Sequence, residues 1–312
     1  MAVLGFGAVT LGREIGEDAS YALLDHAFKL GFRIFDTAEA YGGGNSHAYR
    51  IRTFGEDDVR EASVMMHSSE ILLGRWMQSR GVRSQVEVHT KVSTDHSPQG
   101  IHSALTHSLD RLQTEYVDGY YLHSAPSDPV EAVSGLVEQK KAGRVRRIGI
   151  CNASVDTMAA AQRIAPLDLC QNIYNLAQPD ADRELLPWCR EHNVDFVAYS
   201  PLGAGFLTGK YGARGELAPK GTRFDVVPGH RDVYFRTECF AALDRLTAVS
   251  AQSGIPQRLL ALSWVLRQPD VSIVLIGATR LQHLDNAIEA ASTPVGEHLL
   301  DSLDPDLSLG RP

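Results

Sequence analysis

Short apolar runs rich in β-forming residues alternate with longer segments of helical periodicity along most of this chain. The first run, at residues 3–8, is followed by a segment with apolar residues three or four positions apart, which Gly31 ends. The same alternation recurs until eight strand–helix units have been counted. Strands are predicted at residues 3–8, 33–36, 86–90, 119–122, 147–151, 169–173, 194–199 and 271–276. Helices are predicted at 19–30, from 69, at 101–112, at 129–142, from 155, and at 182–192, 239–253, 256–267 and 281–290.

Regular alternation of strands and helices predicts a parallel sheet covered by helices. Eight units within 312 residues favour a closed (β/α)8 TIM barrel, an α/β fold, formed by residues 1–312 as a single domain. An open doubly wound sheet is the alternative, and it would be expected to carry a Gly-rich dinucleotide turn after an early strand. The only candidate, Gly5-Phe6-Gly7, lacks the third glycine and lies too close to the start of the chain.

Composition excludes several classes of partner. The net charge of −8 argues against nucleic acid or an anionic membrane, since both require basic patches. No apolar run reaches the roughly 18 residues of a membrane span, and the first residues do not form a signal peptide. We therefore expect a cytoplasmic protein without a metal site. The four cysteines fit this reading because none forms a CxxC pair: Cys151, Cys170, Cys189 and Cys239.

Two long stretches interrupt the alternation, at residues 45–68 and 203–237. Long connections in a compact domain are usually functional lids or disordered segments. Both follow a predicted strand, the second and the seventh, and a barrel builds its active site at the carboxyl ends of its strands. We expect long loops there, either as walls of a substrate pocket or as mobile surface segments.

Four polar residues stand near the ends of three adjacent predicted strands: Asp36, Tyr41, Lys91 and His123. Each alone has an ordinary structural explanation, such as a turn cap or a solvated lysine. Together they suit proton transfer, because a nearby ammonium lowers the pKa of a phenol from about 10 and a carboxylate holds that ammonium in place. A neutral histidine adds a hydrogen-bond donor for a substrate oxygen. This is the equipment for protonating a carbonyl oxygen while hydride reaches its carbon.

Motifs along almost the whole chain resemble those of the aldo-keto reductase superfamily. They are GFRIFDTAEAYGGGNS, VHTKVS, VDGYYLHSAP, RRIGICNAS, QNIYN, AYSPLGAGFLTGKY and VLIGATRLQHLDNAIEA, in that order. The resemblance implies a barrel that uses NADPH (NADP+), less often NADH, without metal or flavin. It assigns Asp36, Tyr41, Lys91 and His123 to the catalytic tetrad, with Tyr41 as the proton donor.

The resemblance also implies cofactor contacts. Asn152 and Gln171 match carboxamide clamps for the nicotinamide amide, and Tyr199 matches a residue that stacks on the nicotinamide ring. Cys151 stands where a serine is more usual. The remaining implied contacts, to the pyrophosphate and then to the adenosine 2′-phosphate and adenine, are Ser200, Leu202, Gly205 and Lys210, followed by Gly277, Thr279, Arg280, Gln282 and Asn286. Arg280 is equally well explained as a solvated residue of the first helical turn.

This sequence departs from the family pattern in two places. The chain begins at the first strand, without the N-terminal hairpin that commonly covers the bottom of such barrels. Residues 45–68 intervene between YGGGNS and the next helix, directly after Tyr41, and we expect them to form a lid or specificity wall.

Together these features predict NADPH-dependent reduction of an aldehyde, ketone or sugar carbonyl, with a small-molecule substrate and an oligomeric state left open. Two alternatives remain at this point. One is an NAD(P)-dependent sugar or alcohol dehydrogenase. The other is a cofactor-binding regulatory subunit, like the potassium-channel β subunits.

Overall fold

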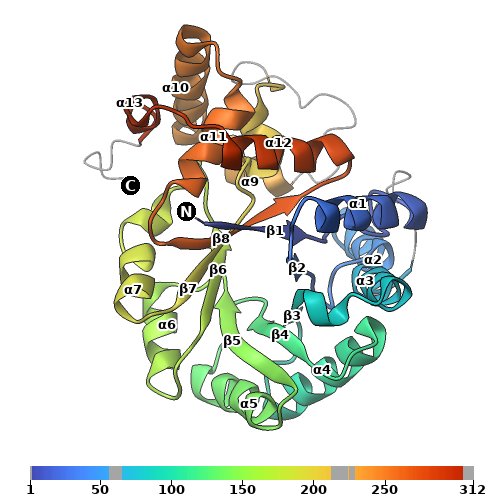
Figure 1. Ribbon diagram of the computed structural model, residues 1–312. Helices are drawn as coiled ribbons and strands as arrows, with labels where there is room; N and C mark the ends of the chain where they lie inside the picture. Colours follow the sequence, from blue (N-terminus) through green and yellow to red (C-terminus); the bar gives the residue numbers. More distant parts are fainter. Residues whose placement is uncertain (1, 56–64, 212–223, 225–228, 305–312) are drawn as a thin grey trace.

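Eight parallel strands close into a barrel in which each strand pairs with the next and β1 pairs with β8 (Figure 1). The computed structural model describes residues 2–55, 65–211, 224 and 229–304. The predicted (β/α)8 barrel is therefore confirmed. Its strands are β1 Val3–Gly7, β2 Ile34–Asp36, β3 Glu87–Val92, β4 Val117–Leu122, β5 Val145–Cys151, β6 Leu169–Ile173, β7 Asp195–Tyr199 and β8 Val271–Gly277.

Helices surround the strands on the outside of the barrel (Figure 1). The α-helices are α1 Glu17–Lys29, α2 Gly43–Phe54, α3 Ser68–Arg80, α4 Pro98–Leu112, α5 Pro129–Lys141, α6 Val155–Gln162, α7 Leu185–Glu191, α9 Gly229–Tyr234, α10 Thr237–Ser253, α11 Gln257–Leu266, α12 Leu281–Ser292 and α13 Glu297–Asp301. Short 3-10 helices lie at Arg83–Gln85, Asp180–Asp182 and Gly203–Thr208.

The starts of several helices follow from local capping. The Ser97 side chain accepts a hydrogen bond from the Gly100 amide, and Pro98 occupies the first position of α4, where its missing N–H costs nothing. Asp128 caps α5 in the same way. These caps fix the residue at which each helix begins, and so the length of the loop between it and the preceding strand.

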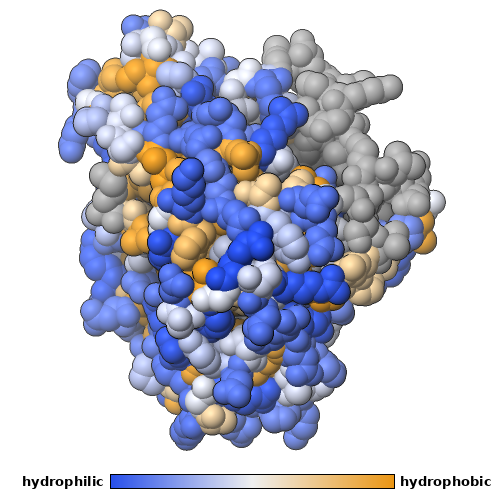
Figure 2. Space-filling view, turned by 45° about the vertical axis from the view of Figure 1, so that its right-hand side comes forward, coloured by the Kyte–Doolittle hydropathy of each residue, from blue (hydrophilic) through white to orange (hydrophobic). Residues whose placement is uncertain are grey.

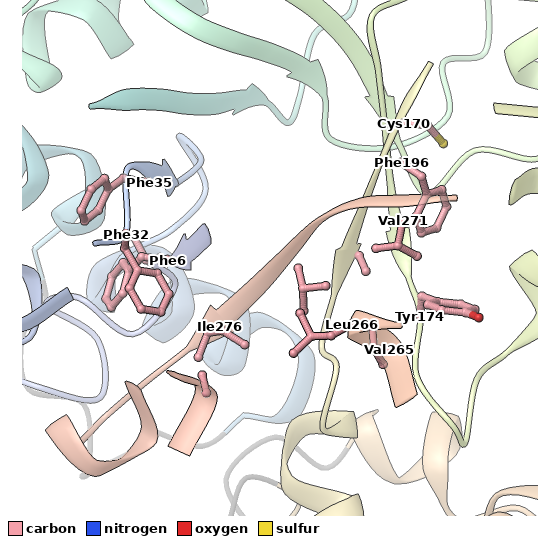
Figure 3. Packing of buried hydrophobic residues seen from close by; sticks show 14 of the residues in the cluster. Phe6, Phe32, Phe35, Cys170, Tyr174, Phe196, Val265, Leu266, Val271 and Ile276 are labelled. Carbon is pink, nitrogen blue, oxygen red and sulfur yellow. The ribbon is translucent and has the colours of Figure 1, made fainter. Parts of the chain in front are cut away.

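Side chains alternate between two packed layers, as the two-residue period of a strand requires. Those facing out pack against helices, including an aromatic group of Phe6, Phe32 and Phe35 and a second group around Phe196 and Tyr174 (Figure 3). Those facing in fill the barrel, which is a packed core rather than a channel. The inner apolar cluster consists of Ile34, Tyr121, Cys151, Leu169, Val197, Ile273 and Leu275.

The stretch after β2 is only partly a loop, so the prediction of a loop from residue 45 is wrong for residues 45–54. These residues form most of α2, which ends at Gly55 with a φ of 70°. The glycines at its start, which are unfavourable in helices, favoured the loop interpretation. Residues 56–64, which carry most of the charged segment, lie outside the described residues, so the lid hypothesis stays a prediction.

Other segments also differ from the prediction. The helix predicted at 182–192 begins only at Leu185, because Pro187 lacks an N–H and is tolerated only in the first turn. The connection predicted at 203–237 contains the Gly203–Thr208 helix and α9, while residues 212–223 and 225–228 lie outside the described part.

Figure 2 shows a mostly hydrophilic face on which hydrophobic residues form small scattered patches. Among the residues that the structure describes, no helix is both long enough and apolar enough to cross a membrane. The cytoplasmic location and the absence of a nucleic-acid partner stay predictions, and we propose that residues 1–312 form one domain around this barrel.

Candidate active site

Strand register gathers the predicted tetrad at the carboxyl end of β2, β3 and β4. Asp36 is the last residue of β2 and pairs with His89, so Lys91 lies one pleat further along the neighbouring strand. Lys91 pairs with Tyr121 of β4, and His123 lies two residues after Tyr121, directly after the end of that strand. The sequence predicted that this strand ends at residue 90 and that Lys91 follows it. In the structure β3 extends to Val92, so Lys91 lies within the strand.

Asp36 and Lys91 form a buried ion pair. Lys91 Nζ donates to Asp36 Oδ1 at 2.5 Å and to the Thr37 carbonyl at 2.6 Å, and neither side chain is more than 3% exposed. Burial lowers the pKa of Lys91, but the attraction of neighbouring groups, the Asp36 carboxylate first among them, outweighs it, so the pKa is raised above its ordinary value. Lys91 is therefore positively charged at neutral pH.

Tyr41 lies against this ammonium. Lys91 Nζ is 5.0 Å from the centre of the Tyr41 ring, and the His123 ring meets Tyr41 edge-on with centroids 5.4 Å apart. The Tyr41 carbonyl accepts a hydrogen bond from the Ser69 amide at 3.3 Å, which ties the loop to the start of α3. The three residues predicted to share one pocket with Asp36 are thus brought together.

The expected lowering of the Tyr41 pKa is not the net result. Lys91 does lower it, but burial raises it more and the Asp36 carboxylate adds to the rise. The pKa of Tyr41 is therefore above its ordinary value. The phenol keeps its proton at neutral pH, which is the state that an acid needs before it donates.

His123 is held at two points. Its Nδ1 lies 2.7 Å from Ser93 Oγ, and its carbonyl accepts from Asn152 Nδ2 at 3.1 Å. Burial, together with the positive charge of Lys91 and the nearby His96, lowers the pKa of His123 to about 3. The imidazole is therefore neutral, as the sequence analysis required.

The two carboxamides expected to clamp a nicotinamide differ in their surroundings. Asn152, with a positive φ of 56°, follows β5 and accepts a hydrogen bond from the Tyr199 hydroxyl at 2.8 Å. Gln171 is buried in β6, where its Nε2 donates to Asp36 Oδ2 at 2.8 Å and its Oε1 faces the Cys151 thiol at 3.7 Å. Gln171 thus contacts the ion pair directly, a contact that the sequence analysis did not predict.

The loop after β7 has an unusual backbone. Ser200, Gly203, Ala204 and Gly205 all have positive φ, with 92° at Gly205. The φ of 92° is one that residues with a side chain rarely adopt, so glycine is favoured at this position. Leu202, half-buried, packs against the core beneath the loop. The amides of Gly203 and Gly205 donate to the carbonyls of Ser200 and Leu202, which fixes this turn.

The β8–α12 connection places cations beside that loop. Arg280 is the N-cap of α12, and its charge lowers the pKa of Lys210 together with the larger effect of partial burial. Burial followed by the charges of Arg280 and Lys210 lowers the pKa of His283 as well. The other predicted contacts line the same turn: Gly277 at the end of β8, Thr279, and Gln282 hydrogen-bonded to Asn286 at 3.1 Å.

Sequence reasoning missed several polar residues of the site. Ser93 lies beside His123, and the Glu39 carboxylate accepts a hydrogen bond from the Ser93 amide. Asn175 Nδ2 donates to the Ser200 carbonyl at 2.9 Å, and His283 lies near Arg280 and Lys210. Ser93 could have been predicted, since it directly follows β3 at the carboxyl end of the barrel, where site residues are expected. It was missed because the strand was predicted to end at residue 90.

Comparison with known proteins identifies the family. Residues 3–304 match the model of the aldo/keto reductase family, and the chain therefore belongs to it. Its members are NAD(P)H-dependent oxidoreductases of carbonyl and alcohol groups, so the resemblance stated above is confirmed.

The similarity to individual relatives extends over most of the length of both chains. The chain is 26% identical to "Aldo-keto reductase yakc [NADP(+)]" of Schizosaccharomyces pombe, over 94% of this chain and 85% of the relative. It is 28% identical to "Probable aldo-keto reductase 1" of Glycine max, over 94% and 82%. An aldo/keto reductase of Klebsiella pneumoniae, solved with NADP and acetate, is 26% identical, with a TM-score of 0.72 over 97% of this chain and 90% of that one. A glycerol dehydrogenase of Gluconobacter oxydans shares the fold, with a TM-score of 0.76, 23% identity and coverage of 96% and 89%.

Proposed function

We propose that this chain is an NADPH-dependent reductase that converts an aldehyde, ketone or sugar carbonyl to an alcohol. The observation that carries the proposal is the position of Tyr41, which lies on the buried Lys91–Asp36 pair and beside the neutral ring of His123. These groups lie at or beyond the ends of three different strands, and no packing requirement explains why an acid, a fixed cation and a neutral donor meet at one point.

In the proposed reaction Tyr41 gives its proton to the substrate oxygen. Tyr41 begins neutral because burial raises its pKa, and Lys91 stabilises the phenolate that forms as the proton leaves. Asp36 holds the Lys91 ammonium in place, and Gln171 supports the second oxygen of that carboxylate. His123, neutral, orients the carbonyl by a hydrogen bond. When bound, NADPH supplies the hydride that the carbonyl carbon receives, so that hydride and proton together reduce the double bond.

The residues present fit NADPH. At the substrate side, Asn152 and Tyr199 form a hydrogen-bonded pair suited to the nicotinamide amide and ring. Further along, Ser200, Leu202, Gly205 and Lys210 would hold the pyrophosphate. At the far end, Arg280 and Lys210 have no ion pair with any residue in the described part of the chain, which leaves their charges for a phosphate. Gly277, Thr279, Gln282 and Asn286 would bind the adenosine.

The names of two relatives support this choice of cofactor. The Schizosaccharomyces pombe relative is named for NADP(+), and the Klebsiella pneumoniae structure contains NADP. A preference for NADPH over NADH would follow from Arg280, because only NADPH carries a 2′-phosphate for the guanidinium to bind.

The test is loss of NADPH absorbance across a panel of aldehydes, ketones and keto-sugars, with Tyr41→Phe assayed beside the wild type. We expect turnover of at least one class and its near-complete loss in the variant, with NADPH still bound. Tyr41→Phe with wild-type turnover would refute the assignment of the acid. Tight NADPH binding without turnover of any compound, in either direction, would instead favour the regulatory alternative.

A further inference from the structure

The ring of His123 has one protein partner whose role the proposed reaction does not yet use. Ser93 Oγ lies 2.7 Å from His123 Nδ1. Ser93 directly follows β3, two residues after Lys91, so that one strand end supplies both the cation and this hydroxyl. Ser93, which is not a member of the tetrad, therefore connects the end of the strand that carries Lys91 to the ring of His123.

Ser93 is itself held by the loop that carries Tyr41. Its backbone N–H donates to Glu39 Oε1 at 2.6 Å, and the Glu39 amide donates to the Lys91 carbonyl at 3.2 Å. The amide of His123 donates to the Val92 carbonyl at 2.8 Å. These bonds lock the ends of β3 and β4 and the β2 loop to one another, so the hydroxyl and the ring cannot easily drift apart.

The direction of this hydrogen bond decides which ring nitrogen carries the proton. A neutral imidazole has one N–H donor and one bare nitrogen, and a serine hydroxyl can donate or accept. Among the described residues, His123 Nδ1 is the one acceptor that the Ser93 hydroxyl contacts, so donation by Ser93 satisfies both groups within the protein. In that direction Nδ1 is the bare nitrogen and the ring proton resides on Nε2.

The opposite end of the ring is free for a ligand. The described residues offer Nε2 no hydrogen-bond partner, whereas Nδ1 and the backbone carbonyl of His123 are both engaged. We propose that Ser93 is a positioning residue that holds His123 as the Nε2–H tautomer and so aims a hydrogen-bond donor at the substrate oxygen. This inference rests on the proposed function for its kinetic consequence but not for the tautomer itself.

Replacement of Ser93 by alanine would remove the donor and leave the ring free to move its proton to Nδ1. A bare Nε2 would then face the lone pairs of the carbonyl oxygen, which repels rather than orients it. We expect kcat to fall about 10- to 100-fold, the range seen when partners that fix a histidine tautomer at metal sites are removed. The dissociation constant of NADPH should not change, because Ser93 lies outside the residues proposed to bind it.

The experiment combines nitrogen NMR with kinetics. Protein labelled with 15N-histidine reports directly which ring nitrogen carries the proton, and the His123 signals are those that disappear in His123→Gln. We expect protonated Nε2 and bare Nδ1 in the wild type, a shift toward protonated Nδ1 in Ser93→Ala, and restoration of both the signal and kcat in Ser93→Thr, which keeps the hydroxyl.

Ser272→Ala is the matched control, since Ser272 Oγ makes a hydrogen bond of equal length, 2.7 Å, to Asp195 at the opposite end of the barrel. It should alter neither the His123 signals nor kcat. Protonated Nδ1 in the wild type would overturn the inference, as would unchanged His123 signals or unchanged kcat in Ser93→Ala. If no substrate is found, the proposed function fails, but the NMR result still decides the tautomer.

Discussion

The two ends of the proposed cofactor site are built on opposite principles. At one end, which we call the catalytic corner (Asp36, Tyr41, Lys91, Ser93 and His123), the charges of Asp36 and Lys91 are paired with each other, and Ser93 engages Nδ1 of His123. At the other end, which we call the cofactor rim (Lys210, Arg280 and His283), burial followed by the charge of Arg280 lowers the pKa of Lys210, and burial followed by both cations lowers the pKa of His283. Among the described residues, no carboxylate forms an ion pair with Lys210 or Arg280.

This difference separates the two tasks. Groups that move a proton must keep one geometry and one protonation state, which buried partners enforce. Groups that bind a phosphate must offer unneutralised charge at the surface until the ligand arrives. Mutations in the catalytic corner should therefore change stability and kcat, whereas mutations in the cofactor rim should change affinity alone.

The largest expected effect is loss of stability on breaking the buried ion pair. Asp36→Asn keeps the volume of the side chain but leaves the Lys91 ammonium buried without a countercharge. We expect the free energy of unfolding to fall by about 3–5 kcal/mol, measured by urea denaturation, with loss of turnover. The double variant Asp36→Asn/Lys91→Met, which removes both charges, should regain much of the stability and none of the turnover. Equal destabilisation of single and double variants would show that the pair is not electrostatically coupled.

A smaller effect is expected from the main cation of the cofactor rim. Arg280→Gln should weaken NADPH binding about 10- to 100-fold, because a charge-assisted hydrogen bond contributes about 1.5–3 kcal/mol. Binding of NADH, measured by the same fluorescence titration, should not change. Arg258→Gln serves as the control, since Arg258 pairs with Glu289 on neighbouring helices. A parallel loss of NADH affinity would mean that Arg280 does not read the 2′-phosphate.

Lys210 should contribute less than Arg280. It is exposed, so its attraction for a phosphate is screened by salt and by water. We expect Lys210→Met to weaken NADPH binding by about two- to fivefold at low ionic strength, with the difference shrinking as salt is added. In the wild type, added salt should raise the Kd of NADPH without changing kcat at saturating cofactor. A salt-sensitive kcat would break the division between the two regions.

The smallest expected effect concerns the pH dependence of kcat, which His123 should not influence near neutral pH. The pKa of His123 is about 3, below the ordinary value near 6.5, so its neutral form prevails throughout neutral pH. Its contribution to stability is complete above pH about 6.5 and is lost as pH falls toward 3. Between about pH 5 and 8, kcat should therefore show no inflection from this residue. An inflection near 6.5 that His123→Gln removes would contradict the neutral assignment.

The sequence predicted the barrel, and the place of the proposed tetrad within it, for a physical reason. Strand and helix periods repeat eight times, and the active site of a barrel lies at the carboxyl ends of its strands, so Asp36, Lys91 and His123 were singled out by position. Their proposed catalytic roles came from the family resemblance. The contact of Gln171 with Asp36 could not be found in this way. It joins residues 135 positions apart across the barrel, and only the register of the closed sheet places them together.

Other misses came from local features. Glycines before α2 concealed a helix, and the two-residue error at the end of β3 hid Ser93. The lowering of the Tyr41 pKa by Lys91 was predicted, but the larger rise from burial was not, because a sequence shows which charges are near but not how far a ring is buried. These quantities depend on packing, which the periodicity of a sequence does not specify.

The most direct test of the division between the two regions is to measure kcat and the Kd of NADPH for Tyr41→Phe and Arg280→Gln side by side, on one substrate. The account predicts that Tyr41→Phe loses about 100-fold or more of kcat with an unchanged Kd, and that Arg280→Gln loses affinity with an unchanged kcat at saturation. If each variant changed both constants to a similar extent, proton transfer and phosphate binding would not be separate functions of the two regions.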